Sequence, residues 1–291
     1  YYGAYAQAGA PVGVILATLA FILISSELSE QAFMDWGWRV PFISSVLLIG
    51  ISMYVQLNLE DTAAFKELQA IKAKRDAESE SVIVRRSPII EALVKYPKRI
   101  ALAAGAFLSI QVAFYILIGF VLAYGGDAAG AAIPRDTMLF AVLVASAIQI
   151  PAQFWAAAYS DRHGRRGIFM LGAFLTGAWS FALFPLIDTG EFWLVVLALS
   201  GGLIFLGLMY GPQAAFFTEL FSTEVRYSGA SLGYQIGAIV GGAFAPTIAT
   251  LLWAEYSIVW VSVYIAGASL LSLISVRMLT ETYKSDLSDV V

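Results

Sequence analysis

Residues 192–218 read FWLVVLALSGGLIFLGLMYGPQAAFFT, a run of twenty-seven residues without a charged side chain. A helix needs roughly 17–25 apolar residues to cross the hydrocarbon core of a bilayer, and it satisfies its own backbone hydrogen bonds there. Seven further stretches have the same character. The eight predicted spans are Gly3–Ser26, Val40–Asn58, Ile100–Tyr124, Thr137–Ser160, Ile168–Ile187, Phe192–Thr218, Tyr227–Ala254 and Tyr256–Val276. The sequence therefore predicts an all-α, polytopic membrane protein.

The composition supports this prediction. Hydrophobic residues make up 59% of the 291 residues and charged residues 13%, which is too few charges to cover a soluble protein of this length. Aromatic residues such as Trp36, Trp193 and Tyr256 lie near the ends of predicted spans, where the polar and apolar parts of a bilayer meet. The sequence contains no cysteine, so disulfide and thiol chemistry are excluded for it.

Lysine and arginine residues gather on one side of the predicted spans. Nine lie between the second and third spans, three follow the fourth, one follows the sixth and two lie in the tail. Only Arg39 and Arg135 fall on the other side. Because basic residues concentrate in cytoplasmic loops, this ratio of fifteen to two predicts that both ends of this chain are cytoplasmic.

Three parts of the chain are expected. Residues 1–58 hold two spans, residues 59–99 form a cytoplasmic linker, and residues 100–291 hold six spans and a short tail. Within the linker, residues 65–72 (FKELQAIK) have apolar side chains at helical spacing beside a charged face, which predicts a helix at the membrane surface or between bundles. Binding of its basic residues to anionic lipid is the alternative.

One short pattern occurs twice. Residues 7–13 (QAGAPVG) and 235–241 (QIGAIVG) both read Q-x-G-x-x-x-G, each in a span followed by one short outer loop and one further span. Glycines at this spacing let membrane helices approach closely. Those expected at helix contacts are Gly9, Gly13, Gly237 and Gly241. The repeat suggests six-helix units, of which the first is represented here only by its last two helices. We therefore expect a fragment of a twelve-helix protein without its first four helices, an organisation typical of secondary transporters.

Amide side chains mark the helices expected to line a cavity. A glutamine in mid-membrane is unfavourable unless it faces a partner or water. Such residues occur in the first, third, fourth, sixth and seventh spans, whereas every third helix lacks them in its middle and is expected to face lipid. The candidate cavity residues are Gln111, Tyr115, Gln149, Gln153, Tyr210, Gln213, Tyr234 and Gln235. For each of them, an ordinary hydrogen bond between helices is an equal alternative.

The loop after the fourth span reads AAYSDRHGRR at residues 157–166. It resembles the loop motif G-x-x-x-D-R-x-G-R-R of the major facilitator superfamily, with Ala157 in place of the first glycine. The resemblance implies a twelve-helix fold with two six-helix halves, and a loop that acts as a latch while the halves rock. The latch residues would be Asp161, Arg162, Gly164, Arg165 and Arg166. Asp161 is expected at the N–H groups of a neighbouring helix, with the arginines at carboxylates and lipid headgroups. A basic loop that only fixes topology is the alternative.

Three further segments are similar to the metabolite:proton symporter branch of that superfamily. They are residues 36–42 (WGWRVPF), 210–221 (YGPQAAFFTELF) and 225–235 (VRYSGASLGYQ). Residues 59–62 (LEDT) and Thr280 depart from patterns that many members carry. The resemblance implies proton-coupled uptake of a small polar organic solute: a dicarboxylate, citrate, shikimate, or a betaine or proline. The alternatives are a uniporter or sugar-type facilitator of the superfamily, and a non-transporting sensor on the same fold.

No acidic or histidine side chain lies within a predicted span, and the single histidine, His163, is in a loop. We therefore expect neutral solute contacts here and a proton-coupling carboxylate in the absent helices. A membrane enzyme would need a nucleophile or metal constellation, and a channel would need a charged pore or a carbonyl filter. Neither pattern is evident, so we expect no enzyme, cofactor or metal site. The expected partners are a solute, protons and membrane lipid, without nucleic acid, for a monomer in the inner (plasma) membrane.

Overall fold

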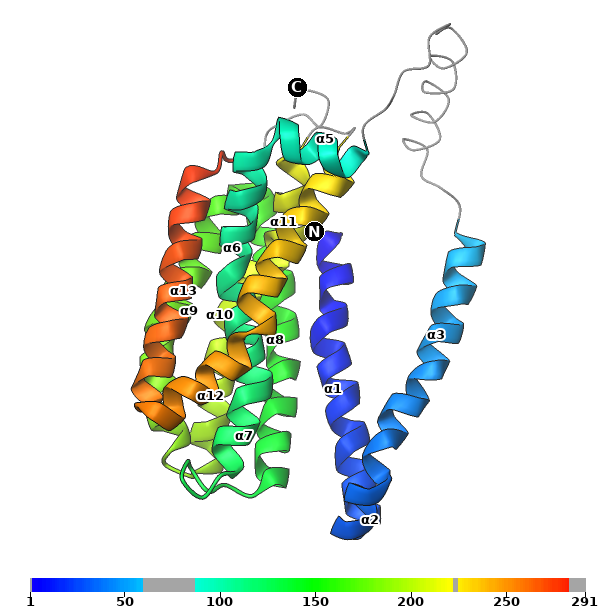
Figure 1. Cartoon of the computed structure of the whole chain (residues 1–291), viewed down its shortest axis with the longest axis vertical. Helices are drawn as coiled ribbons and strands as arrows, with labels where there is room; N and C mark the ends of the chain where they lie inside the picture. Colours follow the sequence, from blue (N-terminus) through cyan, green and yellow to red (C-terminus); the bar gives the residue numbers. More distant parts are fainter. Residues whose placement is uncertain (1, 60–86, 222–224, 283–291) are drawn as a thin grey trace, which may run out of the picture. The chain divides into compact units, whose positions relative to one another are not determined.

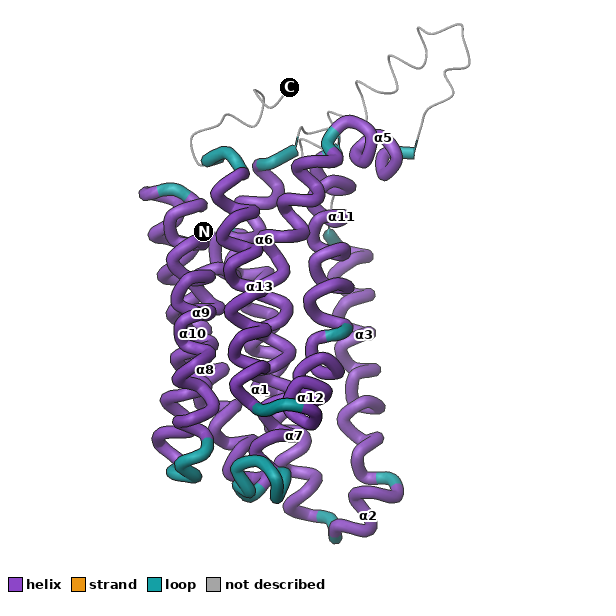
Figure 2. The backbone as a smooth tube through the Cα atoms, turned by 60° about the vertical axis from the view of Figure 1, so that its left-hand side comes forward, coloured by secondary structure: helices purple, strands orange, loops and turns teal. Residues whose placement is uncertain are grey.

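The computed structural model of the chain describes residues 2–59, 87–221 and 225–282. Within these ranges every element is helical, and short loops join the helices (Figure 2). The helix predicted at residues 65–72 lies outside them. The elements are α1 (Gly3–Glu27), α2 (Glu30–Asp35), η1 (Gly37–Arg39), α3 (Val40–Asn58), α5 (Pro88–Lys95), α6 (Pro97–Tyr115), η2 (Ile116–Phe120), α7 (Val121–Gly126), α8 (Arg135–His163), α9 (Arg165–Ile187), α10 (Phe192–Glu219), α11 (Arg226–Ala238), η3 (Ile239–Ala243), α12 (Ala245–Glu255) and α13 (Ile258–Met278).

The eight predicted membrane spans are confirmed. Among the described residues, eight helical segments are long and apolar enough to cross a bilayer. Their ends lie within three residues of the predicted ones, and most of the difference comes from helices that run on into polar residues. Such an extension is expected, because a helix that leaves the hydrocarbon can continue through the headgroup region.

The chain divides into two units, residues 1–19 with 88–291 and residues 20–87. The predicted boundary between residues 58 and 100 stays a prediction. In the second unit, the rest of α1 packs against α2 and α3 through the Phe21 ring, whose centre lies 6.3 Å from that of Phe33 and 6.5 Å from that of Phe42. The guanidinium of Arg39 lies 4.5 Å from the centre of the Trp38 ring, a cation–π contact.

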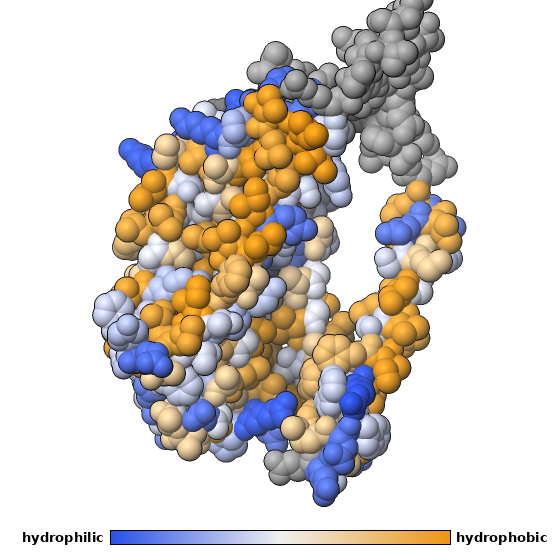
Figure 3. Space-filling view, viewed as in Figure 1, coloured by the Kyte–Doolittle hydropathy of each residue, from blue (hydrophilic) through white to orange (hydrophobic). Residues whose placement is uncertain are grey.

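The first unit is a helical bundle. In it α10 packs along α8 and α9, α13 packs along α9 and α6, and α11 packs along α6 (Figure 1). The side chains of Phe107, Phe169, Phe184 and Phe216 are fully buried between these helices. The outward faces of α9 and α13 are apolar, and Figure 3 shows hydrophobic side chains over the length of the bundle with hydrophilic ones toward its ends. These exposed faces suit contact with lipid.

Serine side chains tie α13 to its two neighbours. The hydroxyls of Ser109 on α6 and Ser269 on α13 are 2.9 Å apart, and the Ser109 N–H donates to the Ser272 hydroxyl at 2.9 Å. On the other side, the Ser262 hydroxyl donates to the Ser180 carbonyl oxygen at 2.6 Å. Small polar residues allow close helix contact in lipid and add hydrogen bonds across it. They hold α6, α9 and α13 together.

Two spans are interrupted by a π-helical turn. The turn η2 joins α6 to α7, and η3 joins α11 to α12. These two spans are packed against each other, since η3 contacts α6 and α12 contacts η2. A π-helical turn inserts one extra residue into the helical repeat, bends the helix and is frequent at functional sites. Both turns lie next to the cavity described below.

Candidate functional site

A cavity of about 190 Å³ lies among α1, α6, α10 and α11. Its lining consists of Ala10, Ile110, Gln111, Phe114, Tyr115, Tyr210 and Tyr234. Gln111 and Tyr115 are four residues apart on α6 and therefore share one helix face. Tyr210 comes from α10 and Tyr234 from α11. The structure thus brings four of the predicted cavity residues together at one site.

A second cavity of about 270 Å³ shares Tyr234 with the first. Its lining consists of Gln7, Gln213, Ala214, Phe217, Thr218, Tyr227, Ala230, Ser231 and Tyr234. The Gln7 amide nitrogen donates to the Gln213 side-chain oxygen at 2.7 Å. Gln213 is buried, so this hydrogen bond is a specific link between α1 and α10. It joins residues 206 positions apart in the sequence.

Glycines of α11 and η3 let this span approach α6 closely. A Cβ atom at Gly237 would lie 2.8 Å from the Ala104 carbonyl oxygen, and one at Gly241 would lie 3.0 Å from that of Leu108. A Cβ at Gly242 would lie 2.6 Å from the Tyr115 ring. Gly237 and Gly241 therefore lie at a helix contact. Gly9 and Gly13 have open space around them among the described residues, and their packing role stays a prediction.

Gln149 and Gln153 lie in a different place, at the contact of α8 with α10. Both side chains are buried, and within the described ranges the Gln149 amide nitrogen and both polar atoms of the Gln153 amide have no hydrogen-bond partner. The backbones meet closely beside them, because a Cβ at Gly211 would lie 2.3 Å from the Gln153 carbonyl oxygen. Neither glutamine lines the two cavities.

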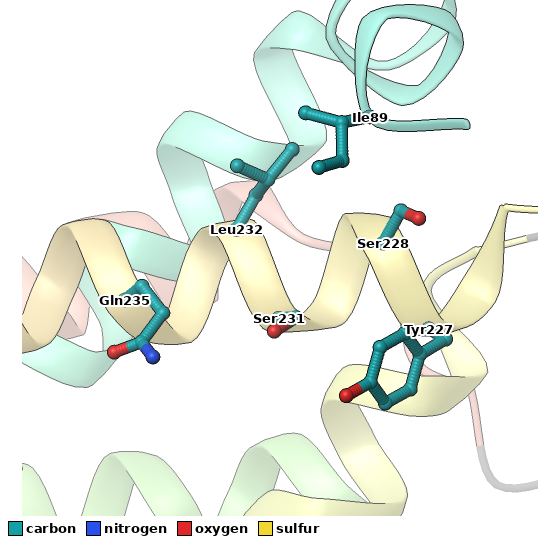
Figure 4. Close-up of a pocket in the computed structure, with 6 residues that line it drawn as sticks. All are labelled: Ile89, Tyr227, Ser228, Ser231, Leu232 and Gln235. Carbon is teal, nitrogen blue, oxygen red and sulfur yellow. The ribbon is translucent and has the colours of Figure 1, made fainter. Parts of the chain in front are cut away.

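Gln235 lines a third pocket of about 160 Å³, which shares Tyr227 and Ser231 with the second cavity (Figure 4). The other residues around it are Ile89, Tyr227, Ser228, Ser231 and Leu232. The side chain of Gln235 is exposed, and in Figure 4 it projects from the same side of α11 as Ser231 and Tyr227. Of the eight predicted cavity residues, five therefore line the first two cavities and three do not.

The two cavities offer neutral contacts. Among the described residues, their lining has amide groups, hydroxyls and apolar surface, and it has no charged side chain. The Tyr234 ring packs against the buried Phe107 ring, and the two ring centres are 4.2 Å apart. The Phe114 ring stands edge-on to Tyr115 at 5.6 Å. Such a surface can hold a solute by hydrogen bonds and by aromatic contacts.

At one end of the bundle, Arg165 is the centre of a charged network. Its guanidinium donates to the Asp161 carboxylate, to the Ser160 hydroxyl at 2.8 Å and to the Glu219 carboxylate at 3.0 Å. Glu219 in turn accepts a hydrogen bond of 2.5 Å from the Thr282 hydroxyl. Only 9% of the Arg165 side chain is exposed, so water screens these pairs less than it screens surface charges. The network joins α8, α9, α10 and the segment after α13.

The carboxylate at the start of α9 belongs to Glu281. Its two oxygens accept the backbone N–H groups of Arg165 at 2.8 Å and of Arg166 at 3.1 Å, where a helix dipole favours negative charge. The expected contact of Asp161 with N–H groups of a neighbouring helix stays a prediction, and the structure places the Asp161 carboxylate on the Arg165 guanidinium. The reason is position: Asp161 lies in the last turn of α8, four residues before Arg165.

The remaining residues of this loop differ in how far their side chains are exposed and in what they contact. The Arg166 guanidinium donates to the carbonyl oxygens of Val276 at 3.2 Å and Arg277 at 2.8 Å, at the end of α13, where positive charge stabilises a helix. Arg162 and His163 are exposed. Gly164 has φ of 104°, a conformation that a side chain would disfavour, and this allows the sharp turn between α8 and α9.

Four members of the network were missed by the sequence reasoning: Ser160, Glu219, Glu281 and Thr282. Two of them carried a usable signal. Glu219 and Glu281 are acidic residues at the basic ends of the spans, and acids that lie among many basic residues are candidates for ion pairs. Nothing in the sequence pairs them with Arg165, because Glu219 is 54 positions away. The mid-membrane amide of the first span is Gln7, and nothing in the sequence pairs it with Gln213.

A family model described as Major Facilitator Superfamily matches residues 2–233 of the chain. Curated relatives match nearly its whole length. The inner membrane metabolite transport protein YhjE of Escherichia coli K12 is 34% identical over 97% of this chain and 62% of its own length. The shikimate transporter of the same strain is 30% identical, with 98% and 64% covered. Its proline/betaine transporter is 24% identical, with 97% and 56% covered.

The chain therefore spans 56–64% of the length of these three relatives. A solved structure, that of a D-xylose–proton symporter, superposes with a TM-score of 0.66. The alignment covers 96% of this chain and 63% of that one at 13% identity. At this identity the likeness concerns the fold. It agrees with the membrane helical bundle that the helices build here.

Proposed function

The chain belongs to the major facilitator superfamily, and from this membership we propose that it is part of a proton-coupled transporter that takes up a small polar organic solute by alternating access. One observation carries the proposal: a cavity without charged side chains among its described residues lies between helices of a membrane bundle, with Gln111, Tyr115, Tyr210 and Tyr234 around it. Solute sites of secondary transporters lie in such a place, between helices that can bend.

The solute class that we propose is an organic acid, such as a dicarboxylate, citrate or shikimate, or a betaine or proline. The relatives named for shikimate and for proline and betaine support this range. The cavity supplies hydrogen bonds from amides and hydroxyls and faces of aromatic rings. Among the described residues its lining has no cation for a carboxylate and no anion for an ammonium group, so an ion-pairing partner would come from elsewhere in the protein.

Proton coupling is proposed from the resemblance of residues 36–42, 210–221 and 225–235 to the metabolite:proton symporter branch. The two cavities have no acidic or histidine side chain among the described residues. The group that binds the proton is therefore proposed to lie outside this set, on a helix that faces the same cavity. We further propose that the protein is a monomer in the inner membrane, with both ends of this chain in the cytoplasm, as the distribution of basic residues favours.

Alternating access needs contacts that can break. The Arg165 network joins four segments at one end of the bundle, and the Gln7–Gln213 hydrogen bond joins α1 to α10. We propose that the Arg165 network acts as the latch. The Gln7–Gln213 hydrogen bond breaks when the solute site becomes accessible from the other side of the membrane. The π-helical turns η2, which follows Tyr115, and η3, which contains Gly242, are the places where the cavity helices can bend.

The test is solute uptake by the full-length protein in vesicles with an imposed proton gradient, across a panel of organic acids and betaines. We expect one solute class to accumulate and a protonophore to abolish the accumulation. Accumulation that persists in the presence of the protonophore would contradict proton coupling. Counterflow distinguishes the alternatives: a carrier, including a uniporter, exchanges labelled solute for unlabelled solute, whereas a sensor on this fold does not.

Gln111→Leu tests the cavity itself. Loss of one hydrogen bond of about 0.5–1.5 kcal/mol should weaken solute binding roughly 2- to 12-fold. Gln235→Leu is the matched control, because it removes the same amide from a residue outside the cavity. Equal effects of both substitutions on the solute dissociation constant would contradict the placement of the site.

A further inference from the structure

The π-helical turn η3 lies next to the first cavity, the one that Gln111 and Tyr115 line. Two residues of the turn, Gly241 and Gly242, are buried, and neither is among the residues that line this cavity. The turn packs against α6, the helix that supplies Gln111 and Tyr115. Its backbone is therefore placed to contact side chains of the candidate solute site without contacting a solute itself.

Glycine at these two positions lets the η3 backbone approach both side chains. A Cβ atom at Gly241 would lie 3.2 Å from the Gln111 Cβ, and one at Gly242 would lie 3.3 Å from the Gln111 amide nitrogen. The same Cβ at Gly242 would lie 2.6 Å and 3.0 Å from two carbons of the Tyr115 ring. Carbon atoms attract best at about 3.5–4.0 Å, so a side chain at Gly242 would need space that the Tyr115 ring now fills.

The π-helical turn explains how two neighbouring residues can meet the same helix. Successive residues point about 100° apart in a regular α-helix, so at most one of two neighbours points straight at a partner helix. A π-helical turn holds one extra residue, which reduces the angle between neighbours. Gly241 and Gly242 thus both face α6, the first at the base of the Gln111 side chain and the second at its amide end.

The η3 backbone is the fixed side of the Tyr115 environment. Tyr115 is 41% exposed, so contacts with protein cover only part of its ring. The Phe114 ring meets it edge-on at 5.6 Å, and the η3 backbone meets it at Gly242. A side chain such as Phe114 can rotate out of the way, whereas backbone packed between helices cannot. The place of the Tyr115 ring therefore depends on η3.

We propose that Gly242 is a positioning residue of the solute site, through which the η3 backbone sets the place of the Gln111 amide and the Tyr115 ring. Gly241 supports the same contact at the base of Gln111. The inference rests on the proposed solute site and adds to it a residue that touches no solute. Because η3 is also a point where its span can bend, a bend there shifts both side chains, and solute affinity depends on the shape of the turn.

Gly242→Ala tests this role through the solute dissociation constant of the full-length protein. The added methyl group displaces the Tyr115 ring, and loss of one hydrogen bond should weaken solute binding about 2- to 12-fold. Gly229→Ala is the matched control on the same span. A Cβ there would lie 2.5 Å from the Phe221 ring, and neither Gly229 nor Phe221 lines the two cavities. Both variants should lower the thermal unfolding midpoint, and only Gly242→Ala should weaken binding.

A second substitution shows whether Gly242 acts through Tyr115. In a protein with Tyr115→Leu the displaced ring is absent, so adding Gly242→Ala should change the dissociation constant by less than about twofold. With Tyr210→Phe, whose ring is not among the contacts of Gly242, the two effects should multiply. Equal weakening by Gly242→Ala with and without Tyr115→Leu contradicts the proposal. Equal weakening by Gly242→Ala and Gly229→Ala contradicts it too.

Gly241→Ala is the second variant, for the case that Gly242→Ala does not fold. A Cβ at Gly241 would lie 3.0 Å from the Leu108 carbonyl oxygen and 3.2 Å from the Gln111 Cβ, which is a milder conflict than the one at Gly242. It should weaken solute binding about twofold, the lower end of the same range. A dissociation constant equal to that of Gly229→Ala would count against the proposal.

Fluorine NMR measures the place of the ring without any solute. In protein made with 3-fluorotyrosine, the Tyr115 signal is identified by its loss in Tyr115→Phe. We expect Gly242→Ala to shift this signal by more than its linewidth and Gly229→Ala to leave it in place. An unmoved signal in folded Gly242→Ala overturns the positioning role. A protein that shows the shift but binds no solute overturns the proposed function instead, so the two failures are distinguishable.

Discussion

At the scale of single residues, the contact of α8 with α10 depends on glycine. A Cβ at Gly211 would lie 2.3 Å from the Gln153 carbonyl oxygen and 3.1 Å from the Ala157 nitrogen, and both atoms belong to the backbone. A backbone cannot move aside as the end of a side chain can. At Gly207, one turn earlier on the same helix, the nearest atoms to such a Cβ are 3.5 Å away. The two glycines therefore differ in what they tolerate.

We predict that Gly211→Ala lowers the stability of the folded protein by about 1–3 kcal/mol, the usual range for overpacking. Gly207→Ala should change stability by less than the measurement error, because its methyl group meets ordinary van der Waals contacts. Thermal unfolding in detergent, followed by the loss of monodisperse protein, measures both. Equal midpoints for the two variants would mean that α8 and α10 are not in close contact.

The types of residue that line the cavity could be predicted from the sequence, but which of the candidates reach the cavity could not. Gln111 and Tyr115 were found because a spacing of four places them on one helix face, which is a local rule. Gln149 and Gln153 obey the same rule, yet their face meets α10 at Gly207 and Gly211. The rotation of each helix about its axis depends on such long-range contacts, and a single sequence does not encode them in a readable pattern.

At the scale of elements, the spans were predictable and their interruptions were not. A bilayer sets the length of an apolar run, so the ends of α3 agree with those expected from the sequence. The π-helical turn Ile116–Phe120 has no proline. Its one glycine does not predict the turn, because these spans contain many other glycines. It depends on how α6 packs against η3 and α12, which is again information at long range.

The loop between α8 and α9 is an element whose charges can be tested one at a time. Asp161 and Glu281 bind the side chain and the backbone of Arg165. We predict that Asp161→Asn and Glu281→Gln each slow transport by the full-length protein about 2- to 5-fold, the change that corresponds to roughly 0.3–1 kcal/mol at a helix end. Solute binding at equilibrium should stay within this range, because the loop is far from Gln111 in the sequence and lines neither cavity.

Asp127→Asn is the control for these two substitutions. It removes the same charge from an exposed turn after α7, where the carboxylate accepts a local hydrogen bond from the Ala129 N–H. Transport should be unchanged by it. If Asp161→Asn and Glu281→Gln also leave the transport rate unchanged, the loop fixes topology and is not a latch.

At the scale of the whole molecule, the distribution of basic residues predicts one orientation. Fifteen of seventeen lysine and arginine residues lie on one side of the spans. Single cysteines in this cysteine-free chain test it: His163→Cys in the loop after α8 and Ala128→Cys in the turn after α7. In intact cells, a maleimide that cannot cross the membrane should label Ala128→Cys only. It should label His163→Cys once the membrane is opened. The reverse pattern would place both ends of the chain outside the cytoplasm.

The contact of α8 with α10 also bears on how the protein is made. A ribosome adds roughly 5–20 residues per second, so α8 enters the bilayer several seconds before α10 is complete. Throughout that interval Gln149 and Gln153 have no Gly207 and Gly211 to shield them, and each exposed amide makes release of α8 into lipid less favourable. We expect α8 to stay beside the insertion machinery until α10 emerges, so that the two helices leave it as a pair. On this expectation, the glutamines buried in the finished bundle set the order in which its helices are assembled.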